Sequence, residues 1–160
     1  MNKLTHLDAT GAAHMVDVSD KAISVREAQA WGKIELSEAT LDLLYSGSLP
    51  KGDALAVARI AAIQGVKKTP DLIPLCHPLM ITKVSVEFER QSGAVGLAVS
   101  VRCSGQTGVE MEALTGVSVG LLALYDMVKG VQKDARISAI ELRRKTGGKS
   151  GDYRAATDKD

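Results

Sequence analysis

The sequence predicts an α+β sandwich in which helices cover one face of a four-stranded, mainly antiparallel sheet. Apolar and polar side chains alternate from Val84 to Cys103 on both sides of a Gln91-Ser92-Gly93 turn, which is typical of a β-hairpin. Residues 28–36 alternate in the same way, as expected of a half-buried strand. Leu114 to Tyr125 carries no charge, which indicates a helix that is buried nearly all round.

The first half of the chain supplies one strand and two helices. Because Ile23 and Val25 have the opposite parity to the strand at 28–36, a bulge is expected near Arg26 or Glu27. Ser37 then caps a short helix that Gly47 ends, and Asp53 caps a second helix over Ala54 to Val66. Small residues on this second helix would let another backbone come close: Ala54, Ala58, Ala61, Ala62 and Gly65.

A proline-rich loop follows, and its prolines exclude a regular central strand. Thr69 and Pro70 are expected at the N-cap and first position of one helical turn. Pro74 and Pro78 hold Leu75, Cys76 and His77 in a stiff loop, where His77 has either a structural or a catalytic role.

The second half supplies the hairpin, the uncharged helix and a last strand over Ile137 to Leu142. Thr107 and Glu110 form the pattern of a capping box, which places a helix start there. The predicted order is strand, helix, helix, loop, strand, strand, helix, strand, and this is the split βαβ, ferredoxin-like arrangement. We expect one domain over 1–160, with a flexible N-terminal arm at 1–12 and a mobile, glycine-rich tail at 145–160.

Composition excludes several classes of function. A formal net charge of +1 argues against non-specific binding to nucleic acid or to a membrane surface. Cys76 and Cys103 do not make a disulfide framework, and the first ten residues contain no apolar run, so we expect a cytoplasmic protein. Leu114 to Tyr125 is too short to span a bilayer. Cys103 is expected to be a small core residue of the hairpin.

Charges occur only near the two ends of the uncharged helix, at Glu110, Glu112, Asp126 and Lys129. Glu112 and Asp126 are 14 residues apart, which is roughly 20 Å along a straight helix. They therefore cannot share a small site within one copy. If all four residues belong to one site, two copies of the helix must pack antiparallel across a two-fold axis.

Other candidate chemistry is weaker. The tail resembles a phosphate loop, but Arg143 stands where a Walker A loop needs a glycine, so the tail is either a flexible terminus or a lid that brings Lys145 and Lys149 to a phosphate. Histidine and cysteine spacing predicts no zinc site. Glu110 and Glu112 could hold Mg²⁺ together with a substrate phosphate, although carboxylates at a helix start need no metal.

Two lysines stand out among residues that are usually solvated. Lys51 lies in a Pro-Lys-Gly-Asp turn, and Lys129 ends an apolar helix beside Asp126. If neighbouring cations and partial burial lower their pKa values, these lysines could act as general acid or base.

The segments that carry these residues resemble the MoaC family, the cyclic pyranopterin monophosphate synthases of molybdenum cofactor biosynthesis. The resemblance spans nearly the whole chain and is carried by LTHLDATGAAHMVDVSDKA, KGDALAVARIAAIQGVKKTPDLIPLCHPL, TGVEMEALT, LYDMVKGVQKD and TGGKSGD. It implies a lyase that converts 3′,8-cyclo-7,8-dihydro-GTP, supplied by a radical S-adenosylmethionine enzyme, to cyclic pyranopterin monophosphate and pyrophosphate. It also implies a ferredoxin-like fold and a homohexamer, a trimer of dimers with sites at the dimer interfaces.

The resemblance also assigns site residues. The implied catalytic cluster is Lys51, His77, Glu110, Glu112, Asp126 and Lys129. Substrate would be framed by Leu75, Cys76, His77, Met111 and Glu112, and Lys67 and Lys68, with His77, would meet the triphosphate. Lys51 and Lys129 would transfer protons, and Asp126 would orient Lys129 or take a proton itself. Two alternatives are a non-catalytic nucleotide-binding or sensor module, and a structural oligomer in which these charges form interface ion pairs.

Overall fold

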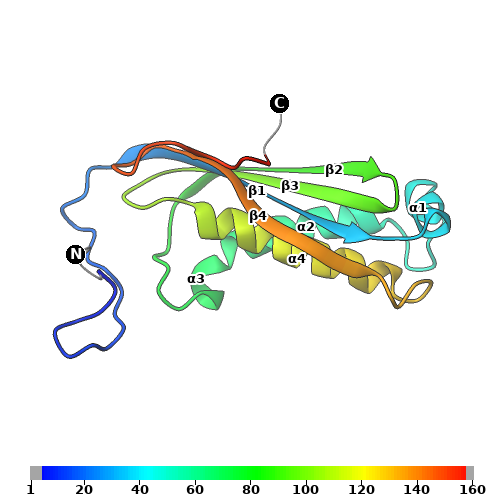
Figure 1. Cartoon of the computed structure of the whole chain (residues 1–160), viewed down its shortest axis with the longest axis horizontal. Helices are drawn as coiled ribbons and strands as arrows, with labels where there is room; N and C mark the ends of the chain where they lie inside the picture. The colour runs from blue at the N-terminus through cyan, green and yellow to red at the C-terminus, as the bar shows by residue number, and fades with distance from the viewer. Residues whose placement is uncertain (1–4, 158–160) are drawn as a thin grey trace.

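The structure, a computed structural model that describes residues 5–157, has helices packed on one face of an antiparallel sheet (Figure 1). The strands are β1 (Ser24–Glu35), β2 (Ile81–Gln91), β3 (Ala94–Gly105), β4 (Arg136–Thr146) and β5 (Tyr153–Arg154), in the sheet order β2-β3-β1-β4-β5. The helices are α1 (Glu38–Tyr45), α2 (Ala54–Lys67), α3 (Thr69–Leu72) and α4 (Glu110–Val128). The α+β prediction is confirmed, and the four long strands have the ferredoxin-like order; the two-residue β5 was not predicted.

Strand β1 is the centre of the sheet, and its alternation is as predicted. Ala28, Ala30 and Ile34 face the core and are almost fully buried. The predicted bulge near Arg26 or Glu27 is wrong, because β1 pairs with β3 in unbroken register from Ser24 to Glu35. The register shifts of β1 lie instead in its pairing with β4.

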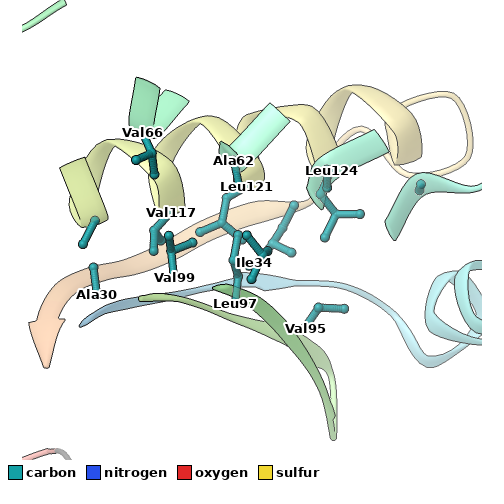
Figure 2. Close-up of a cluster of buried hydrophobic side chains, with 14 of the residues drawn as sticks. Ala30, Ile34, Ala62, Val66, Val95, Leu97, Val99, Val117, Leu121 and Leu124 are labelled. Atoms are coloured by element: carbon teal, nitrogen blue, oxygen red, sulfur yellow. The ribbon is translucent and has the colours of Figure 1, made fainter. Parts of the chain in front are cut away.

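Helix α4 is the core of the molecule, as its uncharged sequence predicts. Figure 2 shows Val117 and Leu121 pointing toward Ile34, Leu97 and Val99 of the sheet, within one buried apolar cluster. Glycines allow this approach: a Cβ at Gly32 of β1 would lie 2.7 Å from Val117 and 2.9 Å from Leu121.

Among the described residues, α4 alone is long and apolar enough to cross a membrane, with 19 residues and a mean hydropathy of 1.4. More than half of that stretch is buried inside the protein. Packing against α2 and the sheet therefore accounts for its apolar sequence.

The helix starts follow the sequence only in part. Ser37 and Asp53 cap α1 and α2 as predicted, each accepting a backbone N–H with its side-chain oxygen. The predicted capping box of α4 is wrong: the helix begins at Glu110, and within residues 5–157 no side chain caps it. Thr69 is also one position off, since it lies inside α3 and donates its hydroxyl to Gly65 O at 3.0 Å.

Both chain ends have local order in their described parts. The arm makes a small hairpin that pairs Leu7 with Ala13. The tail turns at Gly147 and Gly148, both at positive φ, so that β5 returns along β4. Residues 1–4 and 158–160 of these two segments lie outside the described residues, and the flexibility of the arm and the mobility of the tail stay predictions.

Candidate active site

The first group of candidate residues surrounds the N-terminal end of α4. A cavity of about 410 Å³ brings the proline-rich loop, the helix start and the N-terminal arm together. Three loop residues and three helix residues line it: Leu75, Cys76, His77, Glu110, Met111 and Glu112. The N-terminal arm, a name used from here on for the whole stretch before β1, adds Val16, Val18 and Lys21. Six residues that the sequence assigned to one site therefore meet in one cavity.

Glu112 is the buried acid among the residues that line this cavity. Its side chain is 3% exposed, and burial raises its pKa, with Glu110 adding to the same effect. A carboxyl group in this position is held toward its protonated form, which can donate as well as accept a hydrogen bond. Burial also raises the pKa of the Cys76 thiol, so Cys76 is suited to an apolar contact rather than to nucleophilic attack.

His77 connects the loop to the arm. Its Nε2 lies 2.8 Å from Val16 O, within hydrogen-bond distance. The imidazole also helps to lower the pKa of Asp17, although the hydrogen bonds from Ser19 contribute more. His77 thus has a structural contact in this state, and its ring remains on the wall of the cavity.

A second, basic cavity of about 580 Å³ adjoins the first one. The two cavities share Lys21, Thr107, Gly108 and Glu110. Lys21, Arg26, Lys145 and Lys149 bring positive charge to the basic cavity, and Lys145 Nζ lies 3.3 Å from Glu110. Cations grouped beside the start of a helix favour a phosphorylated ligand.

Lys21 and Arg26 are candidate site residues that the sequence did not single out. Arg26 has the same strand parity as Ala28 and Ala30, so it points to the helix side where the core ends. An arginine on the inward face of an alternating strand is a usable signal. The sequence analysis did not use this signal, because a bulge expected near Arg26 left the direction of its side chain undefined.

The second group of candidates lies at the other end of α4. Lys51 Nζ donates to the Asp126 carboxylate at 3.0 Å and to Asp126 O at 2.7 Å, and Lys129 Nζ lies 2.7 Å from the same carboxylate. Hydrogen bonds from Lys129 and then Lys51 lower the pKa of Asp126. The Asp126 carboxylate in turn raises the pKa of Lys129, so a single copy does not meet the condition of a lowered pKa under which this lysine could act as general acid or base.

One continuous helix separates the two groups. Because α4 runs unbroken from Glu110 to Val128, Glu112 and Asp126 lie about 21 Å apart along its axis. The separation predicted from the sequence is therefore confirmed, and the two groups of candidate residues lie at opposite ends of α4 within one copy.

The remaining candidates are more scattered. Lys67 and Glu112 line a third cavity, of about 540 Å³, together with Pro70 and Pro78 of the proline-rich loop. Lys68 is exposed and pairs with Asp71 at 3.4 Å, away from the first group. In residues 5–157, no three His, Cys, Asp or Glu side chains stand close enough together to hold a metal ion.

Comparison with known proteins identifies the family. The MoaC family model matches residues 15–148. The chain belongs to the MoaC family. It is 56% identical, over 96% of its own length and 97% of the relative's, to a protein of Parvibaculum lavamentivorans named cyclic pyranopterin monophosphate synthase. A protein of Streptomyces griseus with the same name is 54% identical over 96% of this chain and 86% of the relative.

The MoaC match covers both groups of candidate residues. Residues 15–148 include the arm from Met15, the proline-rich loop, all of α4 and Lys145. The resemblance drawn from sequence motifs is confirmed, while the role of each residue stays a prediction.

Proposed function

We propose that this MoaC-family protein is a cyclic pyranopterin monophosphate synthase, a lyase that converts 3′,8-cyclo-7,8-dihydro-GTP to cyclic pyranopterin monophosphate in molybdenum cofactor biosynthesis. The two relatives with this name match nearly the whole chain, which carries the proposal. The joined cavities also suit such a substrate, since one holds a buried acid and the other holds four cations.

The basic cavity is the site proposed for the phosphates. Forming a cyclic monophosphate from a triphosphate breaks the bond between the α-phosphorus and the pyrophosphate, so negative charge develops on the leaving group. Lys21, Arg26 and Lys145 can stabilise that charge. This placement moves the phosphates away from Lys67 and Lys68. His77 stays on the wall of the 410 Å³ cavity that Glu112 lines, and Lys67 lines only the third cavity.

The Glu112 cavity is the site proposed for the ring system. A carboxyl group suits the N–H donors of a guanine-like edge. Leu75, Cys76 and Met111 would frame the ring, and His77 would lie beside it. A Mg²⁺ ion could accompany the phosphates.

We propose that a second copy completes the site with its own Lys51, Asp126 and Lys129. The helix side away from the sheet carries exposed apolar residues on both long helices, Val57, Ile60 and Leu122, which an antiparallel pair of copies would bury. Proton transfer would fall to Lys51 and Lys129. Three such dimers would give the homohexamer, acting in the cytoplasm on substrate from a radical S-adenosylmethionine enzyme.

A coupled assay tests this function. Purified protein is given the cyclised GTP substrate, and pyrophosphate and the cyclic pterin are measured together. One pyrophosphate per pterin supports the proposal, and Lys51→Ala or Lys129→Ala should then keep the fold and lose turnover by orders of magnitude. A folded protein that binds the substrate without turnover would indicate the binding module instead.

A further inference from the structure

A glutamine side chain fastens the N-terminal arm to the segment before α4. Gln106 Nε2 donates to Ser19 O at 3.2 Å and to Lys21 O at 3.1 Å. A primary amide nitrogen carries two hydrogens, so these two bonds use its full donor capacity. Gln106 therefore grips two carbonyls of the arm on either side of Asp20.

The anchor behind Gln106 is rigid. Arg26 of β1 donates from Nε to Gly105 O at 3.0 Å and from a terminal nitrogen to Gln106 O at 3.1 Å. Since β1 is the central strand, the backbone of Gln106 is fixed to the sheet. Because its backbone is held firmly, Gln106 can position the arm with a neutral side chain, which adds no charge to the basic cavity.

The gripped segment carries Lys21, which lines both joined cavities. The arm around it is otherwise largely exposed, and its backbone N–H at Lys21 bonds only locally, to Val18 O at 2.9 Å. His77 fixes the arm five residues earlier, at Val16. The two ties thus set the path of the chain between them and the direction in which Lys21 leaves it.

We infer that Gln106 is a positioning residue that holds Lys21 at the junction of the two cavities, where the proposed phosphates begin. This inference rests on the proposed function, because Lys21 serves catalysis only if a phosphate lies beside it. Without the two hydrogen bonds of Gln106, the Lys21 ammonium group would spend less time beside the pyrophosphate leaving group. Catalysis would then be slowed through the displacement of Lys21, because Gln106 itself does not touch the substrate.

A double-mutant cycle tests the inference. Gln106→Ala should leave the unfolding midpoint nearly unchanged and lower kcat/KM for cyclised GTP by about tenfold, as expected for two lost hydrogen bonds. Lys21→Ala should lower it at least as much, and the double variant should lose little more than Lys21→Ala alone. Gln91→Ala, which removes a glutamine that bonds Glu89 on the β2–β3 hairpin, is the matched control and should retain normal kcat/KM.

Amide hydrogen exchange of residues 18–22 gives a readout that needs no activity. Gln106→Ala should speed exchange there, while Gln91→Ala should not. The positioning role would be overturned if Gln106→Ala left the exchange of residues 18–22 unchanged, or if the two losses in kcat/KM simply added in the double variant. The proposed function would still stand in either case, provided that the native protein turns over the substrate. If the native protein showed no turnover, the proposed function and the catalytic role of Lys21 would both be refuted. Amide exchange would still show whether Gln106 holds the arm in place.

Discussion

At the scale of single residues, Asp126 controls the charge state of the lysines beside it. Its carboxylate accepts from Lys51 and Lys129, and the Lys129 pKa is raised chiefly by that hydrogen bond. In one copy the pair is therefore stabilised as ions. If Lys129 is to transfer protons near neutral pH, its pKa must be lowered by groups that arrive with the substrate or with a second copy.

We predict that Asp126→Asn lowers the pKa of Lys129, because the substitution removes the negative charge that raises it. The measurement is an NMR titration of the Lys129 side chain in both proteins. Asp71→Asn, which neutralises another i,i+3 lysine partner, is the control and should leave Lys129 unaffected. An identical Lys129 titration in the Asp126→Asn variant would show that the ion pair does not form in solution.

Glu112 should make stability depend on pH in the direction opposite to that of an ordinary paired acid. Its pKa is raised above the usual 4.5, so the folded protein holds a proton that the unfolded chain has already lost. Stability therefore falls as pH rises from that value through the folded pKa. Glu112→Gln cannot ionise, so its free energy of unfolding should lack this decline in urea titrations at successive pH values. Parallel pH profiles for the two proteins would contradict the burial of an ionisable Glu112.

At the scale of elements, the contact between α4 and β1 depends on the absence of a side chain at Gly32. A Cβ there would lie 2.6 Å from Ala139 O, in addition to its contacts with Val117 and Leu121. Neither the pairing of β1 with β4 nor the packing of α4 leaves room for a side chain at position 32. A shift of β1 that relieved the clash with one of them would disturb its contact with the other.

We expect Gly32→Val to lower the free energy of unfolding by about 1–3 kcal/mol, the usual cost of overpacking a close-packed core. Chemical denaturation measures this change. Gly130→Ala is the matched control, because a Cβ at Gly130 meets nothing within 4 Å, and it should change stability by less than about 0.5 kcal/mol. Equal stabilities of the two variants would mean that α4 packs less closely than the structure shows.

At the scale of the whole molecule, the two groups of candidate residues lie at opposite ends of one helix. Glu112 and His77 belong to one end, and Lys51 and Lys129 to the other. If each active site combines one end from each of two copies, then a copy damaged at one end can still contribute its other end.

We predict that two inactive variants restore activity when they are co-expressed. A mixed dimer of Glu112→Gln and Lys129→Ala copies contains one intact site and one doubly damaged site. Random pairing at equal amounts should give about a quarter of the native turnover per copy. Each variant expressed alone is the control, and a mixture no more active than either one would contradict sites shared across a two-fold axis.

The fold was largely predictable because its signals are local. Alternation predicted β1 and the β2–β3 hairpin, and the uncharged run predicted α4 as the core helix. The capping box at Thr107 failed, since Glu110 lies near Lys145 of the tail instead of capping its own helix. The prediction of a bulge near Arg26 was also wrong. Ile23 and Val25 are exposed, so their apolar side chains do not indicate which face of the strand meets the core.

The candidate site was predictable where motifs and spacing carry it. The resemblance named six of the residues that line the Glu112 cavity, and the 14-residue separation on α4 showed that one copy could not hold the whole cluster. Lys21, Arg26 and Gln106 were missed, because their importance depends on segments more than 75 residues apart that meet only in the folded chain.

The sequence by itself determined the α+β class, the MoaC resemblance and the separation of the two charged groups, because periodicity, motif order and helical rise are properties of neighbouring residues. Only the tertiary structure decided which cations line the basic cavity, that the Asp126 carboxylate raises the Lys129 pKa instead of neighbouring cations lowering it, and that Gln106 hydrogen-bonds to the arm. Those features depend on burial and on hydrogen bonds between distant segments, and neither exists until the chain has folded.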